Sequence, residues 1–558
     1  MRSRASPPCS PSRACSCHPG SAARNFSLRC ERTSIASTTC SCAGSSTPDS
    51  PCVRLSLTRE APTVLLADSS PSQQWLAYVV KESRFVQTLP FHLFSPNLPA
   101  QFAHLPHAGS SGKALEAFTA HSSPSLPPAE RLAYCEDAVH LPARDGAAER
   151  ALVLVSCDPG RKRWNTVIGP LADPHSAQGA LWVVDALGGE GEVVHKVELE
   201  WAALERGEAQ FHPLGLALAP RVDGGDDDEL RLFVVNHGAA HSTVEVFSLS
   251  PSPSPHRPPS HRATHLFTLS HPALSTAPNS IAPLSRTALF LSHDHRHSRR
   301  ARSLVGRVAN AVETLGALPY ARVDYVAFDE PDDGGAQVTV RAETVVEGVS
   351  FANGLALSPA QDTLVVASTS RRELLFYDVR PAPSPASPAH APPLLTLRRT
   401  VSLPMLVDNL SLLPSPRNST TLTVLAAGHP SYPALLSAAH GRNLRLRLPG
   451  PLREWATTLG ALEWAEWDVQ LRADEQRGMS WAVAVRDPPL AGSGGVGERE
   501  EEGEEWETVY QSSGRIAEGG FGGSTTAVAG GGSSAAGEER AWMVVVGLYE
   551  EGVRIVHE

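Results

Sequence analysis

From residue 131 onward the chain consists of short apolar runs rich in β-branched residues, and this pattern constrains the fold most. Turns separate the runs, which cover residues 151–156, 181–185, 230–235, 243–249, 288–292, 321–328, 363–367, 374–378, 421–426, 481–485 and 542–547. Many short strands with few helical stretches predict an all-β sandwich, barrel or propeller. Several neighbouring runs repeat one strand–turn–strand plan, such as 363–367 with 373–377 and 231–235 with 244–247. Recurrent hairpins favour a propeller.

Three low-complexity insertions interrupt the strands, near 250–262, 381–393 and 492–505. They are rich in Pro and Ser or in Glu and Gly, so they cannot bury enough apolar surface to offset the entropy of ordering them. We expect surface loops at the edges of the repeats.

The N-terminal part has a different composition from the rest of the chain. Seven of the nine cysteines lie in residues 1–55, among Ser, Pro and Arg and without a C-x-x-C pair, so a disordered leader is favoured over a zinc site. Its Arg and Ser content resembles an organellar transit peptide more than a secretory signal, and an incorrect start site would look the same. Localisation therefore stays open. Residues 56–128 are expected to be a linker or loosely attached arm, followed by one propeller over 129–558.

Charge and hydropathy exclude two classes of partner. The chain has 48 Lys and Arg against 59 Asp and Glu, a formal charge of −11, so it has no overall basic field for nucleic acid or an anionic membrane. The longest apolar runs, such as 541–549, are shorter than the roughly 18 to 20 residues that span a bilayer. The sequence predicts neither a nucleic-acid partner nor a transmembrane segment, and it does not support membrane or lipoprotein association.

Four short segments place acid and amide side chains beside strand-like runs: 135–137, 279–280, 351–354 and 406–409. Ca²⁺ takes six to eight oxygen ligands, and carboxylates mixed with Asn amides supply them without concentrating too much negative charge. Together the segments predict a calcium ion at the centre of a ring of strands. The alternative, that these are independent turn residues, stays open at this point.

Several motifs resemble the paraoxonase/arylesterase family, whose members carry F-x-P-H-G followed by V-V-N-H-x-x-x-x-S-T-V-E. Here 211–216 is Phe-His-Pro-Leu-Gly-Leu, and 234–245 matches the second motif nearly residue for residue. Further matching segments follow the family's order, from Glu136-Asp137 to Gly-His-Pro at 428–430. The resemblance implies a six-bladed β-propeller with calcium in its central tunnel, held by Glu136, Asn279, Asn353, Asp408 and Asn409.

The resemblance also implies a second, structural calcium. Its ligands would be Asp137, the backbone carbonyl of Leu216 and an aspartate at the position that Ser280 occupies here. Loss of that carboxylate weakens the expected site.

The family's water-activating histidine is replaced here by Leu214. His212 lies two residues earlier and would share a strand face with it if the segment is extended. His237 matches the family's second histidine and is the predicted base or base-orienting residue, with Glu136 as the alternative base.

Three further residues are expected around the pocket. His429 matches a pocket histidine of the family, and the pair Asp294 and His295 matches a pair expected to support the tunnel.

Beyond residue 55 only Cys135 and Cys157 remain, so we expect no disulfide framework there. Because the C-terminal cysteine common in the family is missing, the ring is expected to close by strand pairing alone.

The implied activity is hydrolysis of carboxylic esters or lactones, in which calcium polarises the carbonyl and an activated water attacks it. The partner would be a small-molecule ester or lactone. Two alternatives are a gluconolactonase-type sugar lactonase and a catalytically weak, calcium-stabilised propeller that acts as a binding or structural protein. Leu214 is the main support for the last.

Overall fold

The computed structural model describes most of the chain from residue 98 onward. The described residues are 29–31, 39–41, 98–102, 107, 109, 115–142, 151–175, 177–188, 193–221, 229–251, 261–331, 338–381, 391–414, 421–432, 434–435, 439, 478–487, 505–533 and 539–557. Most of the expected leader, much of the expected arm and the centres of the three insertions lie outside them. No helix within these ranges is both long and apolar enough to cross a membrane.

The chain divides into two units, residues 1–88 and 89–558. In the first unit the structure describes β1 (Arg29–Glu31) and β2 (Thr39–Ser41), which pair antiparallel with Cys30 opposite Cys40.

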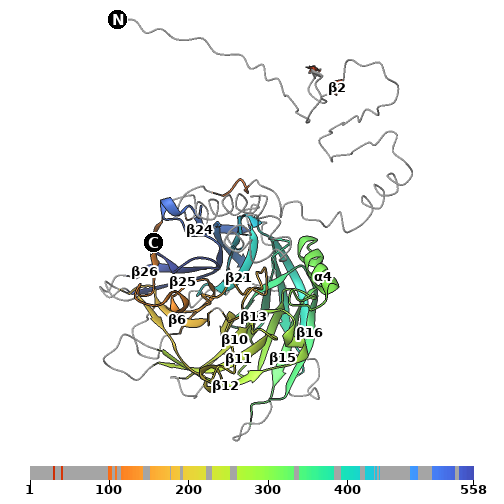
Figure 1. The fold of residues 1–558 in the computed structure, drawn as a ribbon. Helices are drawn as coiled ribbons and strands as arrows, with labels where there is room; N and C mark the ends of the chain where they lie inside the picture. Colours follow the sequence, from red (N-terminus) through yellow and green to blue (C-terminus); the bar gives the residue numbers. More distant parts are fainter. Residues whose placement is uncertain are drawn as a thin grey trace, which may run out of the picture. The chain divides into compact units, whose positions relative to one another are not determined.

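The second unit is a six-bladed β-propeller, as predicted, and the colours in Figure 1 follow the chain around the ring. Blade one consists of β4 (Cys135–His140), β5 (Leu152–Cys157), β6 (Ala180–Asp185) and β7 (Val194–Lys196). Blade two consists of β9 (Pro213–Leu218), β10 (Leu230–Asn236), β11 (Thr243–Pro251) and β12 (His261–Leu269), with β8 (Glu198–Glu200) parallel to β12. Blade three consists of β13 (Pro278–Pro283), β14 (Ala288–His293), β15 (Ala321–Phe328) and β16 (Val340–Val349).

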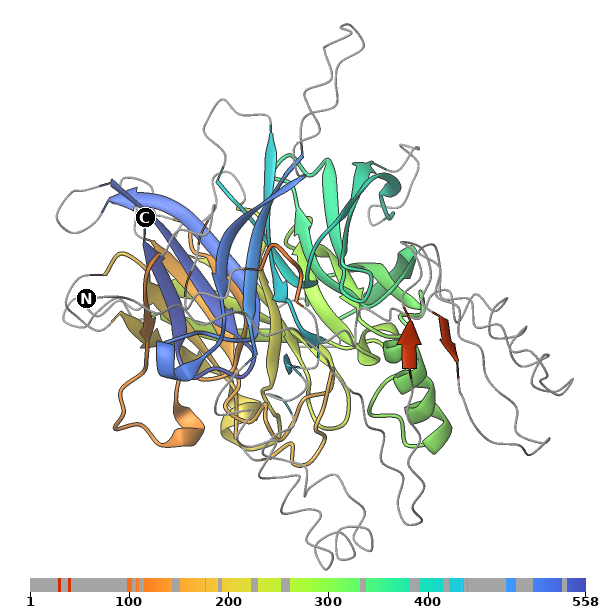
Figure 2. The same ribbon diagram turned by 90° about the horizontal axis from the view of Figure 1, so that it is seen from above.

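The second half of the ring follows the same order. Blade four consists of β17 (Ala352–Leu357), β18 (Thr363–Ser368), β19 (Glu373–Arg380) and β20 (Leu394–Ser402). Blade five consists of β21 (Leu406–Leu412), β22 (Leu422–His429), β23 (Ser480–Asp487) and β24 (Trp506–Ser512). Blade six consists of β25 (Ser524–Ser533), β26 (Glu539–Gly547), β27 (Val553–His557) and β3 (Glu116–Ala120). Figure 2 shows the blades from a second direction, together with α4 (Leu304–Leu315). A single short helical turn, α3 (Ala202–Glu205), follows β8.

The ring closes through β3, which pairs antiparallel with β27 from Ala120 opposite Val553 to Glu116 opposite His557. The ring therefore closes by strand pairing, as the sequence predicts. Residues 116–120 were expected in the loosely attached arm, and the structure corrects this, because they form the fourth strand of blade six.

Residues near Phe102 also depart from the expected loose arm. The Phe102 side chain is only 4% exposed, and its ring centroid lies 5.5 Å from that of Trp481 in blade five. Nearby, the Gln511 amide donates a hydrogen bond to the Gln101 carbonyl at 3.2 Å. This part of the arm is packed because it buries an aromatic ring against the propeller.

Six hydrophobic cores lie between the six pairs of neighbouring blades. In β5, for example, Val153 and Val155 pack toward blade six, whereas Leu154 packs toward blade two. Because successive side chains of a strand point to opposite faces, a strand between two cores is apolar at every position. This explains the continuous apolar runs in the sequence.

A disulfide joins Cys135 in β4 to Cys157 in β5, where the two residues lie directly opposite each other. The structure therefore adds one disulfide to the part of the chain in which no disulfide framework was expected. Sequence separation gave no sign that these cysteines occupy facing positions of a hairpin.

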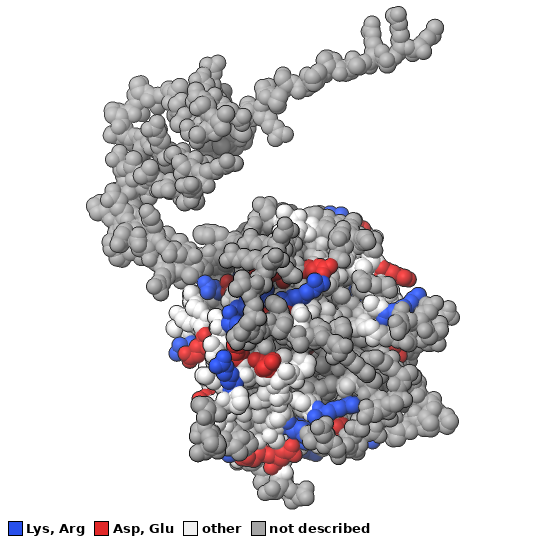
Figure 3. All heavy atoms as spheres, turned by 180° about the vertical axis from the view of Figure 1, so that it is seen from behind, with Lys and Arg blue, Asp and Glu red and all other residues white. Residues whose placement is uncertain are grey.

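Charged side chains of both signs are interspersed on the face shown in Figure 3, and no large basic patch gathers on its described part. Ion pairs among the described residues include Arg398 with Asp487 at 2.6 Å.

Candidate metal centre

The first strand of every blade lies at the centre of the ring, where it contacts the first strands of both neighbouring blades. Each of these six inner strands has a register irregularity in its pairing with the second strand. A β-bulge inserts an extra residue and re-aims side chains. The irregularities fall at Glu136, at Asn279, at Asn353 and at the pair Asp408 and Asn409.

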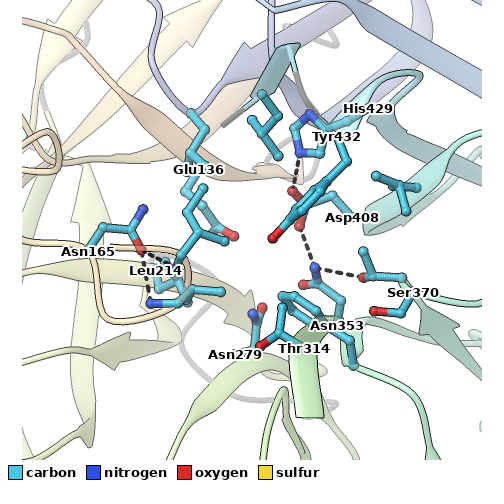
Figure 4. A pocket seen from close by; sticks show the side chains of 17 residues that line it. Glu136, Asn165, Leu214, Asn279, Thr314, Asn353, Ser370, Asp408, His429 and Tyr432 are labelled. Atoms are coloured by element: carbon cyan, nitrogen blue, oxygen red, sulfur yellow. Dashed lines mark hydrogen bonds and ion pairs between the residues drawn. The ribbon is translucent and has the colours of Figure 1, made fainter. Parts of the chain in front are cut away.

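The bulges bring the predicted ligands together. Glu136, Asn279, Asn353 and Asp408 line one cavity, and Figure 4 shows their polar ends directed toward a common centre. The Asn353 amide donates to Asp408 Oδ1 at 2.7 Å. The fifth residue, Asn409, donates from Nδ2 to Glu136 Oε1 at 3.0 Å. All five positions therefore belong to one cluster drawn from four blades.

The cluster holds oxygen atoms that lack hydrogen-bond donors. Four are buried without a partner among the described residues: Glu136 Oε2, Asn279 Oδ1, Asn353 Oδ1 and Asn409 Oδ1. Buried polar atoms are almost always paired, so these four acceptors form a group that a cation or another hydrogen-bond donor would satisfy. No group of three or more His, Cys, Asp or Glu side chains is placed to hold a metal within the described ranges. An all-oxygen set with few carboxylates fits Ca²⁺.

The pKa of Glu136 also favours a positive charge at this cluster. Burial raises the pKa of Glu136 well above its ordinary value, and the nearby negative charges of Asp137 and Asp408 raise this pKa further. Arg161 opposes the shift without cancelling it. A buried group of carboxylates with this balance would be stabilised by a cation.

The walls of the cavity contrast with its polar end. They are apolar for much of their extent: Val167, Ile168, Leu214, Phe351, Leu406, Leu435 and Leu548. Leu214 is 3% exposed and also packs into the core between blades two and three. A ligand here would place an apolar body against these walls and a polar group at the oxygen cluster.

His429 is the histidine that lines this cavity. Its Nε2 lies 2.9 Å from Asp408 Oδ2, whereas Nδ1 is buried and has no hydrogen-bond partner in the described part of the chain. The carboxylate favours the tautomer with the proton on Nε2, which leaves the Nδ1 lone pair available.

His237, the predicted base, is placed differently. It is absent from the described cavity lining, and both ring nitrogens are engaged: Nε2 donates to the Pro278 carbonyl at 2.7 Å, and Nδ1 faces the Thr166 hydroxyl. The geometry gives His237 a positioning role, because it holds the residue that precedes Asn279. Its catalytic role stays a prediction.

His212 does not replace the missing histidine either. Its Nδ1 lies 2.9 Å from Asp158 Oδ2, and Nε2 donates to the Pro174 carbonyl at 2.8 Å, so it is a buried structural histidine outside the cavity lining. The pair Asp294 and His295 is also internal, with Oδ1 and Nδ1 2.8 Å apart. His295 Nε2 lies 2.7 Å from the hydroxyl of Thr314, a cavity residue on α4, so the pair contacts the cavity wall, and its predicted supporting role stays a prediction.

Thr369 is a site residue that sequence reasoning missed. Its hydroxyl accepts from the Asn353 amide at 3.2 Å and donates to the Val407 carbonyl at 2.7 Å, so it orients Asn353 and links blade four to blade five. A single threonine after a strand carries no sequence signal of this role.

Asp137, Leu216 and Ser280, predicted for a second calcium, line a different cavity along the C-terminal halves of the inner strands. Burial raises the pKa of Asp137 to about 6, although backbone hydrogen bonds from Leu216 and Ala138 act against this shift.

The lowered pKa of His237 predicts that the stability of the folded chain depends on pH. Burial, with the charge of Arg300 adding to it, lowers the pKa of His237 from 6.5 to about 3. Below about pH 6.5 the unfolded chain takes up a proton that the folded chain rejects, so stability is fully present above this pH and is lost as pH falls toward 3.

We therefore expect the free energy of unfolding to fall more steeply between pH 6.5 and 4 in the wild type than in His237→Gln, by up to about 1.4 kcal/mol per pH unit. Gln is the matched variant because its amide can donate to Pro278 and accept from Thr166. Urea unfolding at several pH values measures this, and equal slopes would contradict it.

Comparison with known proteins gives distant relatives. No protein-family model matches the chain. Serum paraoxonase/arylesterase 2 from Canis lupus familiaris and from Homo sapiens are each 28% identical over 207 residues, which is 37% of this chain and 47% of theirs. Serum paraoxonase/arylesterase 1 from Mus musculus is 25% identical over 206 residues. The match thus spans about half the length of these curated relatives.

One solved structure, a functionally unknown protein from Desulfotomaculum acetoxidans, is 12% identical with a TM-score of 0.27, covering 53% of this chain and 65% of that one. That likeness is too low to carry an argument. The sequence matches confirm the resemblance that the motifs predict: the chain is similar to the paraoxonase/arylesterase family.

Proposed function

We propose that the chain is a calcium-dependent hydrolase of carboxylic esters or lactones. The observation that carries this proposal is a group of four unpaired buried oxygens, three of which belong to residues that line an apolar-walled cavity. The distant similarity to serum paraoxonase/arylesterase supports the same class of activity.

The residues that would hold the metal are Glu136, Asn279, Asn353, Asp408 and Asn409. Bound calcium would supply Lewis-acid stabilisation of the negative charge that develops on a carbonyl oxygen. The hydrogen bonds from Asn353 to Asp408 and from Asn409 to Glu136 keep these side chains in place before a substrate arrives. Such preorganisation reduces the reorganisation needed during reaction.

His429 is the group best placed to accept a proton from the attacking water. Nδ1 is free among the described residues, and the Asp408 carboxylate beside Nε2 would stabilise the imidazolium that forms. The proton could then pass from Nδ1 to the leaving alkoxide. Glu136 stays the alternative base, since its Oε2 also lacks a partner there.

The cavity walls favour aryl or aliphatic substrates over sugar lactones. Leu214, Phe351 and Leu406 offer no hydrogen-bonding side-chain groups to the hydroxyls of a sugar ring, and Asn165, Thr314 and Ser370 are among the lining residues that could do so. Each buried hydroxyl left without a partner would weaken binding. The sugar-lactonase alternative is therefore less well supported.

Leu214 favours a second candidate function, a calcium-stabilised propeller with weak catalysis. It forms part of the cavity wall at the position where the resemblance implies a water-activating histidine. A leucine there cannot move a proton.

Removing calcium with a chelator, or replacing Asn353 by Ala, should abolish hydrolysis of phenyl acetate and of aliphatic lactones. Asn353→Ala deletes one oxygen of the cluster and the hydrogen bond to Asp408. Glu229→Gln, which removes an exposed carboxylate, is the control and should keep wild-type activity. Initial rates with and without added calcium test this, and unchanged activity after both treatments would exclude the proposal.

His429→Gln should lower kcat by about 10²- to 10⁴-fold, the usual contribution of a general base, with little change in calcium binding. His237→Gln is the matched control, and we expect its kcat to stay near the wild-type value because His237 does not line the described cavity and the Gln amide can keep the hydrogen bond to the Pro278 carbonyl. Steady-state kinetics of both variants decide between the two histidines. A comparable loss in His237→Gln alone would restore His237 as the base.

Leu214→His should raise kcat, because it returns an imidazole to the cavity wall, whereas the apolar control Leu214→Met should not. The readouts are turnover on an ester panel and the melting temperature with and without calcium. A calcium-dependent melting temperature without turnover in the wild type would favour the second candidate function.

A further inference from the structure

The second calcium implied by the resemblance can be compared directly with the residues present. Its three expected ligand positions are Asp137, the Leu216 carbonyl and position 280. The carboxylate expected at 280 is a serine hydroxyl here. We therefore consider what each of these groups contacts.

The Asp137 carboxylate is surrounded by donors. Its Oδ2 accepts from the Leu216 backbone N–H at 2.8 Å, and its Oδ1 accepts from the Ala138 N–H at 2.8 Å. The Thr526 hydroxyl lies 3.0 Å from Oδ1 and 2.9 Å from the Glu136 carbonyl, so its single proton is shared between these acceptors. These donors face three of the roughly four lone-pair sites of the carboxylate.

Ser280 is also engaged. Its Oγ accepts from the Leu355 backbone N–H at 3.1 Å, and its own N–H donates to the Ser292 hydroxyl at 2.9 Å. Its side chain adds no negative charge. Only Asp137 would remain as a charged ligand, which is a poor set for a hard divalent ion.

The two parts of the axis differ in their unpaired atoms. In the first cluster four oxygens are buried without a partner among the described residues, whereas neither Asp137 nor Ser280 has such an atom. The two clusters lie on inner strands of the ring. Burial does not explain the difference, because Asp137 is only 5% exposed and Ser280 only 4% exposed. The first cluster therefore has unpaired oxygens that a cation would bind, whereas the side chains of Asp137 and Ser280, which line a second cavity, already have hydrogen-bond partners.

We propose that a hydrogen-bonded clasp replaces the second calcium of this fold. The clasp consists of Asp137, Thr526 and Ser280 with the backbone N–H groups of Leu216 and Leu355. Through Asp137 it joins blade six to blade one and blade one to blade two, and through Ser280 it joins blade three to blade four. The chain then holds no calcium at Asp137.

The clasp acts at the point where the ring closes. Blade six contains both chain-distant strands β3 and β27, and Thr526 in its inner strand contacts Asp137 in blade one. A hydrogen bond there ties the last blade to the first without a metal. The stability that it confers is therefore expected to be independent of calcium.

Calcium content of the full chain tests the inference. The probe is Ca²⁺ itself, measured by mass spectrometry after equilibrium dialysis of the wild type and of Asn353→Ala. We expect one calcium in the wild type and none in Asn353→Ala. A calcium retained in Asn353→Ala and lost in Asp137→Asn would overturn the clasp.

The expected count of one calcium ion rests on the proposed function, whereas the inference that no calcium binds at Asp137 does not. A wild type without any calcium would refute the proposed function and leave the clasp standing. A wild type with two ions would refute the clasp alone.

A stability measurement covers the case in which Asn353→Ala does not fold. Thr526→Val should lower the melting temperature by on the order of 2 °C, equally in excess calcium and in excess chelator. Thr526→Ser keeps the hydroxyl and should restore most of the loss. A loss confined to calcium-containing buffer would mean that Thr526 serves a metal, which contradicts the clasp.

Discussion

The pairing of β3 with β27 is the constraint on which the rest of this structure depends. It joins residues 116–120 to 553–557, so the six sheets form a closed circle. Only in a closed circle does every blade have a neighbour on both faces, and each of the six cores needs two blades. Closure also fixes the distance of the inner strands from the axis. Gly354 shows how tight this is, since a Cβ there would lie 2.7 Å from the backbone of Asn409.

The closed ring buries carboxylate and amide oxygens along its axis, and these oxygens need positive or hydrogen-bonding partners. The two clusters on the axis differ in the partners that the protein supplies. At Asp137 the protein supplies N–H and O–H donors of its own. At Glu136 and Asp408 it leaves neighbouring oxygens without donors. Backbone donors cannot be everywhere, because bulges turn side chains inward at the cost of ladder hydrogen bonds. The polar end of the cavity therefore consists of oxygen atoms to which no backbone N–H group of the described residues donates a hydrogen bond.

Prediction from sequence succeeded where burial leaves a continuous signal. The apolar runs correspond to second and third strands of blades, such as β5 and β6, which lie between two cores. Inner strands were found only through their acid and amide residues, and exposed outer strands such as β20 gave no run. The side-chain direction of His237 and the pairing of Cys135 with Cys157 depend on bulge geometry and register. Neither is encoded locally.

The repeated bulge makes each blade responsible for one position in a shared ring. The equivalent residues are Glu136, Leu214, Asn279, Asn353, Asp408 and Thr525. With both acids ionised, these six side chains sum to a formal charge of −2, from Glu136 and Asp408, which equals the charge of one divalent cation in magnitude. Because each blade contributes its position through its own bulge, replacing a charged side chain in one blade by a neutral one changes this formal charge by one unit.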